Sequence, residues 1–325
     1  MRADTRPSRR EVVAIGLGAL VVAVVPVAAR RGPRLVRRTL PVMGTIAEIV
    51  ASGLRTDRAE AAIDAAMREL TAVDLTMSRF RPESDIGRVN REAHLHPIVV
   101  SAATAEVVRE GLRWAAASDG GFDPAIGRVV ELWDVNHHDA PPPDERVHRL
   151  AGRHFHHLVE VGTERGAPAI AFSSDEVHLD LGGIAKGWGV DRAAAVLRDR
   201  GVTSALVDVG GDLVAIGASP DGSPWRVGVR DPDDPRGIAT TLDATDCAIA
   251  TSGDYEQFFR YRGTRYHHLM DPATASPARR GLHSATVRAA RCLDADAGAT
   301  TAFTLSPMDA ARALATRGAD LVASA

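Results

Sequence analysis

Hydrophobic residues recur at intervals of three and four in two stretches of the chain. One stretch begins at Thr56, and the other begins at Ser101 and ends at Gly120-Gly121. This spacing places the apolar side chains on one face and predicts two amphipathic helices. We predict three further helices, over residues 189–200, 293–303 and 307–317.

Short apolar or alternating runs predict strands elsewhere in the chain. The stretch 39–52 alternates toward a strand, and strands predominate from residue 169 onward. Gly210-Gly211 and Gly263-Thr264 look like the turns of hairpins. The predicted strands beyond residue 169 are 169–172, 177–181, 204–209, 212–216, 225–230, 258–261, 266–270 and 284–289.

The order of these elements predicts the fold class. Helices and strands do not alternate regularly, and no segment repeats at a fixed period. We therefore predict an α+β fold with a mixed, largely antiparallel sheet flanked by helices. The segment 134–157 looks irregular and holds a histidine cluster. Its histidines lack regular ligand spacing and alternate with Arg153 and Phe155, so we interpret the cluster as solvated surface and not as a metal site.

Composition and charge narrow the class of protein. The 325 residues are 45% hydrophobic and 25% charged, as in an ordinary soluble globular protein. The formal net charge of −3 implies no broad cationic face, which argues against nucleic acid as the main partner. Cys247 and Cys292 have no CxxC or metal-binding spacing. We favour two buried thiols, with a disulfide as the alternative in an oxidising compartment.

The first residues carry a targeting pattern. Ser8-Arg9-Arg10 opens an uncharged run from Val12 to Ala29 that ends in small residues. Twin arginines before such a run are typical of a twin-arginine export signal, and an uncleaved membrane anchor is the alternative. Residues 1–29 are therefore the predicted signal or anchor, 30–38 a basic linker and 39–325 the folded domain. Both interpretations place that domain outside the cytoplasmic membrane, in a periplasmic or equivalent location, with membrane contact only through the N-terminal segment.

Two patterns suggest a phosphate site and a metal site. In Asp180–Gly187 an apolar run leads into a glycine-rich loop that opens a helix, where backbone N–H groups can bind phosphates. The pattern matches neither a P-loop nor a dinucleotide fingerprint, and an ordinary strand-to-helix turn is the alternative. Asp296 and Thr300 stand four residues apart on one predicted helix face, and two such hard oxygens suit Mg²⁺. An acid at a helix start with an unrelated threonine is the commoner meaning of that spacing.

Two Asp-Pro pairs mark fixed turns. They occur in Gly121-Phe122-Asp123-Pro124 and in His268-Leu269-Met270-Asp271-Pro272. A histidine three residues before such an aspartate is a candidate general base, although both pairs also fit plain turns.

The order of the motifs carries more information than any one of them. The chain contains in succession the motifs MGT, SRF, SDIGRVN, DGGFDPAIGRVVELW, DLGGIAKGWGVDRA, VDVGGDLVAIG, IATSGDYEQFF, YHHLMDP and DADAGATTAF. This series resembles the ApbE family of FAD:protein FMN transferases, from about residue 39 to the C-terminus. The resemblance implies a single domain with two lobes that bind FAD between them. It also implies an acceptor flavoprotein whose Ser or Thr lies in a short flavinylation motif.

The resemblance assigns roles to individual positions. It places a Mg²⁺ site at Asp296, Thr300 and the carbonyl of Gly183, and it makes His268 our candidate base. Ala299 stands where some members have a second Asp, and Phe80 where Tyr is common. Two alternatives stay open, a metal-dependent FAD pyrophosphatase and a non-catalytic FAD-binding protein. The FAD contacts implied by the resemblance are Met43, Phe80, Gly121, Phe122, Asp123, Asp180, Lys186, Leu269 and Met270.

Overall fold

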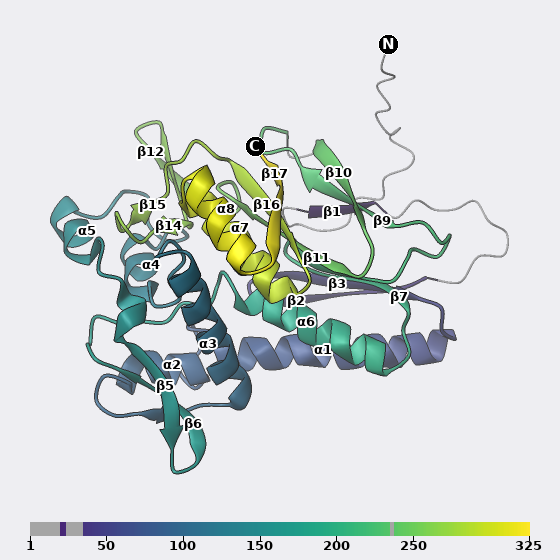
Figure 1. Ribbon diagram of the computed structural model, residues 1–325, viewed down its shortest axis with the longest axis horizontal. Coiled ribbons are helices and arrows are strands. Elements are labelled where there is room, and N and C mark those ends of the chain that lie inside the picture. Colours follow the sequence, from purple (N-terminus) through teal and green to yellow (C-terminus); the bar gives the residue numbers. More distant parts are fainter. Residues whose placement is uncertain (1–19, 24–34, 235–236) are drawn as a thin grey trace.

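The computed structural model describes residues 20–23, 35–234 and 237–325 (Figure 1). The twin-arginine pattern and most of the uncharged run lie outside these residues. From that run the structure describes only β1, Leu20–Ala23, a short strand antiparallel to β9. In the described part of the chain, no helix is long and apolar enough to cross a bilayer.

A seven-stranded sheet forms the centre of the molecule (Figure 1). Its strand order is β17-β16-β11-β8-β7-β3-β2, and every neighbouring pair is antiparallel. The middle strand β8 is buried at each of its positions, so both faces of the sheet are covered. The strands are β2 (Val36–Val42), β3 (Thr45–Ser52), β7 (Ser204–Val209), β8 (Asp212–Ile216), β11 (Cys247–Gly253), β16 (Ser284–Ala289) and β17 (Ala319–Ser324).

Helices cover one face of this sheet. α7 packs on β11 and β16, α6 packs on β8, and α1 lies against α6 on the outside (Figure 1). Their apolar stripes and the sheet form the main hydrophobic core, in which Ile49, Ile63 and Leu70 are fully buried. These helices are α1 (Thr56–Met77), α6 (Ala185–Asp199), α7 (Cys292–Thr304) and α8 (Pro307–Thr316).

A second, smaller sheet covers the opposite face. It has the order β1-β9-β10, with β9 at Trp225–Arg230 and β10 at Ile238–Ala244. Trp225 is almost fully buried between the sheets and anchors a separate small core with Leu213 and Ile249.

The remaining elements form a second lobe beside the sheet (Figure 1). The side chain of Asn90 donates to the Leu179 carbonyl and accepts from the Leu179 amide, and these two hydrogen bonds tie this lobe to the loop before α6. The lobe contains α2 (Asp85–Glu92), α3 (Ala102–Ala117), α4 (Gly127–Trp133), α5 (Asp144–Leu150), a 3-10 turn (Phe155–Leu158) and a sheet of β4 (Ile98–Val99), β5 (Val159–Glu164) and β6 (Ala167–Phe172). Two hairpins border it, β12 (Phe258–Tyr261) with β13 (Thr264–His267) and β14 (Met270–Asp271) with β15 (Ser276–Pro277).

The predicted α+β class is confirmed, but several element predictions are wrong. Residues 39–52 belong to a hairpin, because the chain turns back at Met43-Gly44. Residues 177–181 form no strand, and 266–270 divides between β13 and β14. The supposedly irregular segment 134–157 contains α5, and His156 within it is buried.

Candidate functional site

A cavity of about 550 Å³ lies beside the β2–β3 turn. Met43 and Phe80, both predicted FAD contacts, line it together, and the end of α1 supplies Asp74 and Ser78. Its volume is within the range of small-molecule sites. Another cavity, of about 330 Å³, is lined by α4 and α5 and holds none of the predicted residues.

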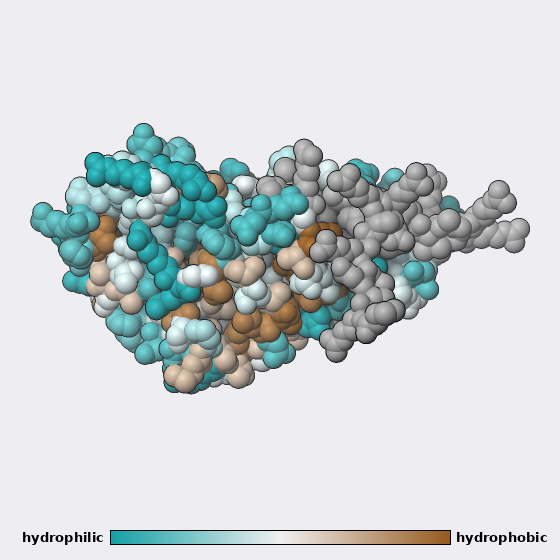
Figure 2. All heavy atoms as spheres, turned by 90° about the horizontal axis from the view of Figure 1, so that it is seen from above, coloured by the Kyte–Doolittle hydropathy of each residue, from teal (hydrophilic) through white to brown (hydrophobic). Residues whose placement is uncertain are grey.

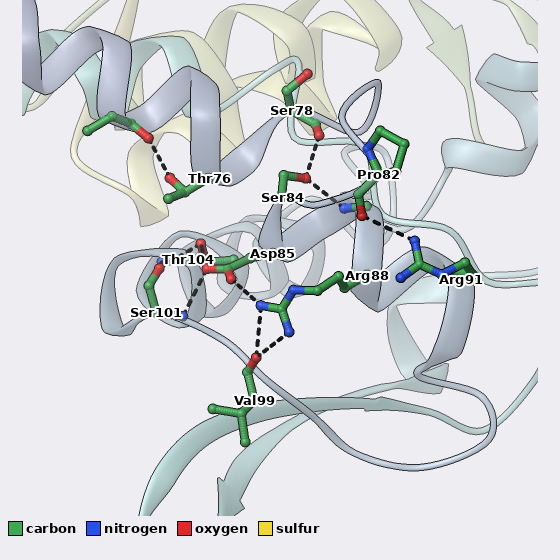
Figure 3. A network of polar contacts seen from close by, with 12 residues as sticks. Thr76, Ser78, Pro82, Ser84, Asp85, Arg88, Arg91, Val99, Ser101 and Thr104 are labelled. Atoms are coloured by element: carbon green, nitrogen blue, oxygen red, sulfur yellow. Dashed lines mark hydrogen bonds and ion pairs between the residues drawn. The ribbon is translucent and has the colours of Figure 1, made fainter.

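The turn that carries Phe80 is fixed by hydrogen bonds (Figure 3). The Ser84 hydroxyl donates to the Ser78 carbonyl (2.7 Å) and, as the N-cap of α2, accepts from the Gly87 amide (2.8 Å). Asp85 accepts from the amide of Ser101 at 2.9 Å. These contacts hold the backbone around Phe80, whose ring is 73% exposed and therefore free to contact a ligand.

Met43 occupies a strained position in the β2–β3 turn. Its φ is 54° and that of Gly44 is 72°, as a two-residue turn with two positive φ angles requires. A left-handed non-glycine residue is uncommon and occurs often at ligand sites. The Met43 sulfur lies 3.6 Å from where a Cβ of Gly189 would stand, so this wall of the cavity touches α6.

Arg79 joins the exposed ring to the glycine-rich loop. Its guanidinium stacks 4.1 Å from the Phe80 ring centroid and pairs with Asp180 at 2.8 Å. The other oxygen of Asp180 accepts from the Gly182 amide at 2.8 Å. Asp180, a predicted FAD contact, thus supports the loop and the ring, and Arg79 is a further residue of the site that the sequence analysis did not single out.

Beyond the cavity, two carboxylates share one lysine. Lys186 Nζ lies 2.5 Å from Asp212 and 3.3 Å from Asp296. Burial alone would lower the pKa of Lys186, but the two carboxylates outweigh it and raise that pKa, so the lysine is charged. The lysine side chain is 27% exposed, against 3% for each carboxylate, so the ammonium is the solvent-facing member of the group.

When both carboxylates are ionised, the trio Lys186, Asp212 and Asp296 carries one negative charge in excess. Burial, together with the Asp296 charge, raises the pKa of Asp212, and burial raises that of Asp296. An added cation would offset the cost of keeping both carboxylates ionised. Asp212 was missed in the sequence, where the available signal was an acid in an otherwise apolar strand directly after Gly210-Gly211.

Thr300 and Gly183 lie next to this trio. A Cβ on Gly183 would stand 3.0 Å from the Thr300 hydroxyl and 3.3 Å from the Phe122 ring, so both side chains lie close to Gly183. Thr300 is one turn after Asp296 on α7, as predicted. A hydroxyl, a carboxylate and a nearby carbonyl are hard oxygen donors of the kind Mg²⁺ prefers. The fully described residues contain no cluster of three His, Cys, Asp or Glu able to hold a metal.

Helices α6 and α7, which carry Lys186 and Asp296, pack against each other with their backbones in contact. A Cβ on Gly187 would stand 2.3 Å from the Cys292 carbonyl oxygen, so only glycine fits. The Asp191 carboxylate accepts from the amides of Cys292 and Leu293 at the start of α7. Asp296 accepts from the Gly187 amide at 3.0 Å, which closes the contact from the other side.

Gly121 and Asp123, both predicted FAD contacts, are held in place by neighbouring residues. A Cβ on Gly121 would meet Leu305 at 2.3 Å, and its carbonyl accepts from Thr304. Asp123 is buried and bonds the amide and the Nδ1 of His156, both within 3.1 Å. Asp123 therefore holds its turn in place, and interpreting His156 as surface was wrong because this carboxylate draws the imidazole inside.

His268 follows β13 directly, and its neighbours divide between site and core. Its Nδ1 lies 3.3 Å from the Gln257 carbonyl, and burial lowers the pKa of His268 to about 4, so the ring is neutral at neutral pH. His267 is buried, with Nε2 2.9 Å from the Ala278 carbonyl. Leu269 and Met270 are also buried and belong to the main core.

Comparison with known proteins gives consistent matches over most of the chain. The model of the ApbE family matches residues 43–323. The FAD:protein FMN transferase of Vibrio cholerae is 35% identical over 238 residues, which cover 72% of this chain and 70% of that protein. The FAD:protein FMN transferase of Treponema pallidum is 34% identical over 280 residues, 81% of this chain and 77% of that protein.

Solved structures agree with the sequence matches. The ApbE protein of Thermotoga maritima has a TM-score of 0.80 at 28% identity, with 89% of this chain and 93% of that chain covered. The flavin transferase ApbE from Vibrio cholerae has a TM-score of 0.75 at 30% identity, with coverage of 88% and 92%.

Proposed function

The chain belongs to the ApbE family, and we infer from this membership that it is an enzyme that transfers FMN from FAD to another protein. In finer detail, we propose that a Ser or Thr hydroxyl of the acceptor attacks the FMN-side phosphorus of FAD. The bond from that phosphorus to the bridging oxygen breaks, and AMP leaves. The acceptor becomes a flavoprotein with FMN linked through a phosphoester.

Two buried carboxylates, Asp212 and Asp296, share the single ammonium of Lys186, and this arrangement carries the proposal. A cation beside them would stabilise the form in which both are ionised, at the place where FAD would bring its pyrophosphate. Asp296, Thr300 and the Gly183 carbonyl would hold Mg²⁺, which when bound supplies a Lewis acid for the phosphoryl oxygens. Lys186 presents its ammonium to the same anionic group and lowers the cost of gathering negative charge there.

Other residues bind and orient FAD in this proposal. Phe80, stacked under Arg79, offers an aromatic face for a flat ring system, and Met43 also lines the cavity. The pinned turn at Ser84 keeps that face in one place, so less ordering is needed when FAD binds.

His268 is our candidate for the base that accepts the hydroxyl proton. Its ring is neutral above about pH 4, so a nitrogen lone pair is available at neutral pH. Gln257 orients the ring through Nδ1, which leaves Nε2 for the acceptor hydroxyl. Binding of the FAD phosphates nearby would raise the pKa of His268 toward the range in which proton transfer is most efficient.

We also propose that the enzyme works outside the cytoplasmic membrane. The support is the Ser8-Arg9-Arg10 pattern with the uncharged run behind it. An export signal or an anchor at residues 1–29 would leave membrane contact to that segment alone. A fractionation experiment with the full chain tests this, since recovery of the protein only from the cytoplasm would contradict it.

One experiment separates the transferase from a FAD pyrophosphatase. The purified enzyme is incubated with FAD, Mg²⁺ and candidate acceptor proteins, and both the acceptor mass and free FMN are measured. A transferase adds FMN to one Ser or Thr of the acceptor and releases AMP in equal amount. Release of free FMN and AMP with no modified acceptor would identify a pyrophosphatase.

A further inference from the structure

The β12–β13 hairpin and the turn after β15 carry an excess of arginine. Residues 254–283 contain five arginines and three acids, in a chain whose net charge is −3. Two of the acids, Asp254 and Asp271, are buried and already pair with Arg265 and Arg280. The third acid, Glu256, is exposed, and the exposed arginines of this segment outnumber it, so its outer surface is net cationic. Figure 2 shows strongly hydrophilic residues gathered over the end of the molecule where β12 stands in Figure 1.

Two of these arginines oppose each other across the hairpin. Arg260 and Arg265 are register partners on β12 and β13, and like charges directly opposite destabilise a strand pair. Arg265 is compensated by Asp254 at 2.6 Å. Arg260 has no carboxylate within 4.0 Å in the described part of the chain and lies only near the Phe258 ring, 5.9 Å from its centroid.

Two more arginines on this surface have only aromatic neighbours. Arg262 lies over Tyr261 at 5.2 Å and Arg279 over Tyr266 at 5.5 Å, and neither has a carboxylate partner among the described residues. A ring supports a guanidinium from one side and leaves its N–H groups directed at solvent. These groups are thus held in place without being neutralised.

The hairpin is firmly attached and ends at the candidate base. Tyr266 stacks between Trp133 of α4 (5.5 Å between centroids) and Phe259 (5.2 Å). β13 ends at His267, so the next residue is His268. The hairpin and the candidate base are therefore continuous in the chain.

We propose that Arg260, Arg262 and Arg279 form a docking surface for the acceptor protein, and that the acceptor presents acidic residues beside its Ser or Thr. The inference rests on the proposed transferase function. Uncompensated arginines fixed on rings match carboxylates in charge and hydrogen bonding. Arg260 and Arg262 lie on the hairpin whose second strand leads to His268, so acidic residues bound there would hold the acceptor on the same element as the candidate base.

The probes are two labelled peptides with the same central Gly-rich, Thr-containing sequence. One has four Asp or Glu in its flanks and the other has Asn or Gln there. At low salt we expect the FAD-loaded wild type to bind the acidic peptide about tenfold more tightly. The preference should shrink strongly at about 0.5 M NaCl, where screening acts over only a few ångströms.

Variants connect the preference to these arginines. Arg260→Glu/Arg262→Glu should abolish it, and Arg260→Lys/Arg262→Lys should keep most of it. Arg58→Glu/Arg198→Glu makes the same change in net charge on exposed positions of α1 and α6, and it should leave the preference intact. Circular dichroism and FAD affinity, both expected to be unchanged, verify the fold of each variant.

Several results would overturn the docking surface. These are equal binding of the two peptides by the wild type, a preference that survives in the double Glu variant, and weaker FAD binding in that variant, which would make the arginines FAD contacts. Binding to phosphatidylglycerol vesicles without a peptide preference would assign the surface to a membrane. The transferase proposal fails separately, if the wild type modifies no acceptor at all.

Discussion

Replacing Asp212 with Asn tests whether the second carboxylate on Lys186 serves the metal site. The substitution keeps the size of the side chain and removes its charge. Lys186 then has one carboxylate partner, Asp296, at 3.3 Å. We expect the lysine to bind Asp296 more tightly and so to compete with Mg²⁺ for it.

The expected magnitude follows from the geometry of the trio. Breaking a buried ion pair by removing one partner costs roughly 3–5 kcal/mol, and we expect about 2–3 kcal/mol because Asp296 still compensates Lys186. At about 2–4 °C per kcal/mol for a domain of this size, the melting temperature should fall by about 5–10 °C. Two unit charges 4 Å apart at an effective dielectric constant of 20 interact by about 4 kcal/mol. We expect the Lys186–Asp296 attraction to strengthen by about one third of that energy, about 1.4 kcal/mol. Mg²⁺ must overcome this gain to bind Asp296, so its apparent affinity should fall about tenfold.

The assay is FMN transfer as a function of Mg²⁺ concentration, with FAD affinity measured separately. Asp212→Asn should need about ten times more Mg²⁺ for half-maximal rate and should recover much of its rate at saturating Mg²⁺. Asp243→Asn, which removes a charge from β10 in the other sheet, serves as the control. A Mg²⁺ dependence of Asp212→Asn equal to that of the wild type would refute the role given to the shared lysine.

Four further predictions test other parts of the site. Asp296→Asn should lower transfer steeply at low Mg²⁺, more than Asp212→Asn does, and a normal rate there would remove Asp296 from the metal site. His268→Ala should lose transfer by on the order of 10²–10⁴-fold while still binding FAD; loss of FAD binding instead would make His268 a cofactor contact. Ser84→Ala removes the N-cap of α2 and the hydrogen bond that holds the turn near Phe80, so it should cost about 1 kcal/mol of stability by urea unfolding. It should also raise KM for FAD, and an unchanged KM would show that the turn needs no such support. Burial raises the pKa of Asp208 to about 7, so the folded state keeps this proton to higher pH than the unfolded chain and the wild type loses stability between about pH 4 and 7. Asp208→Asn should therefore match the wild type below about pH 4 and be more stable at pH 8, by up to about 4 kcal/mol, and equal stability at pH 8 would contradict the shift.

His267 illustrates where strand alternation was a sufficient guide and where it was not. Alternation predicts that His267 and His268 face opposite sides, and their different partners agree with this. No motif or spacing in the sequence gives His267 a role. The structure buries it between the Ala278 carbonyl and Phe303, so His267→Ala should destabilise the fold.

Turn residues and apolar runs predicted correctly those elements that depend only on residues adjacent in the sequence. The Gly210-Gly211 turn and its flanking apolar runs correctly gave the β7–β8 hairpin. Residues 177–181 have the same apolar character but form an isolated bridge, between His178 and Ile126, and no strand pair. The backbone of Leu179 is hydrogen-bonded instead by Asn90, 89 positions away, and no local pattern reveals such a partner.

The candidate site shows the same division. Asp296 and Thr300 were found because their spacing follows from one helix, and that helix formed as predicted. Asp212, Arg79 and His156 depend on which elements meet in space. A buried charge can be recognised in a sequence as unusual, but its partner is fixed only when β8, α6 and α7 pack together.

The crossing of α6 and α7 at Gly187 limits how this enzyme can be re-engineered. Since the Gly187 Cα faces the Cys292 carbonyl with no room for a methyl group, the two helices cannot slide to accommodate a larger or smaller nucleotide. Directed evolution toward other cofactors should therefore accumulate changes in the turn around Phe80 and in the β2–β3 loop. Libraries that randomise the helix crossing should yield mostly inactive or insoluble protein, so mutational effort is better spent at the rim of the cavity.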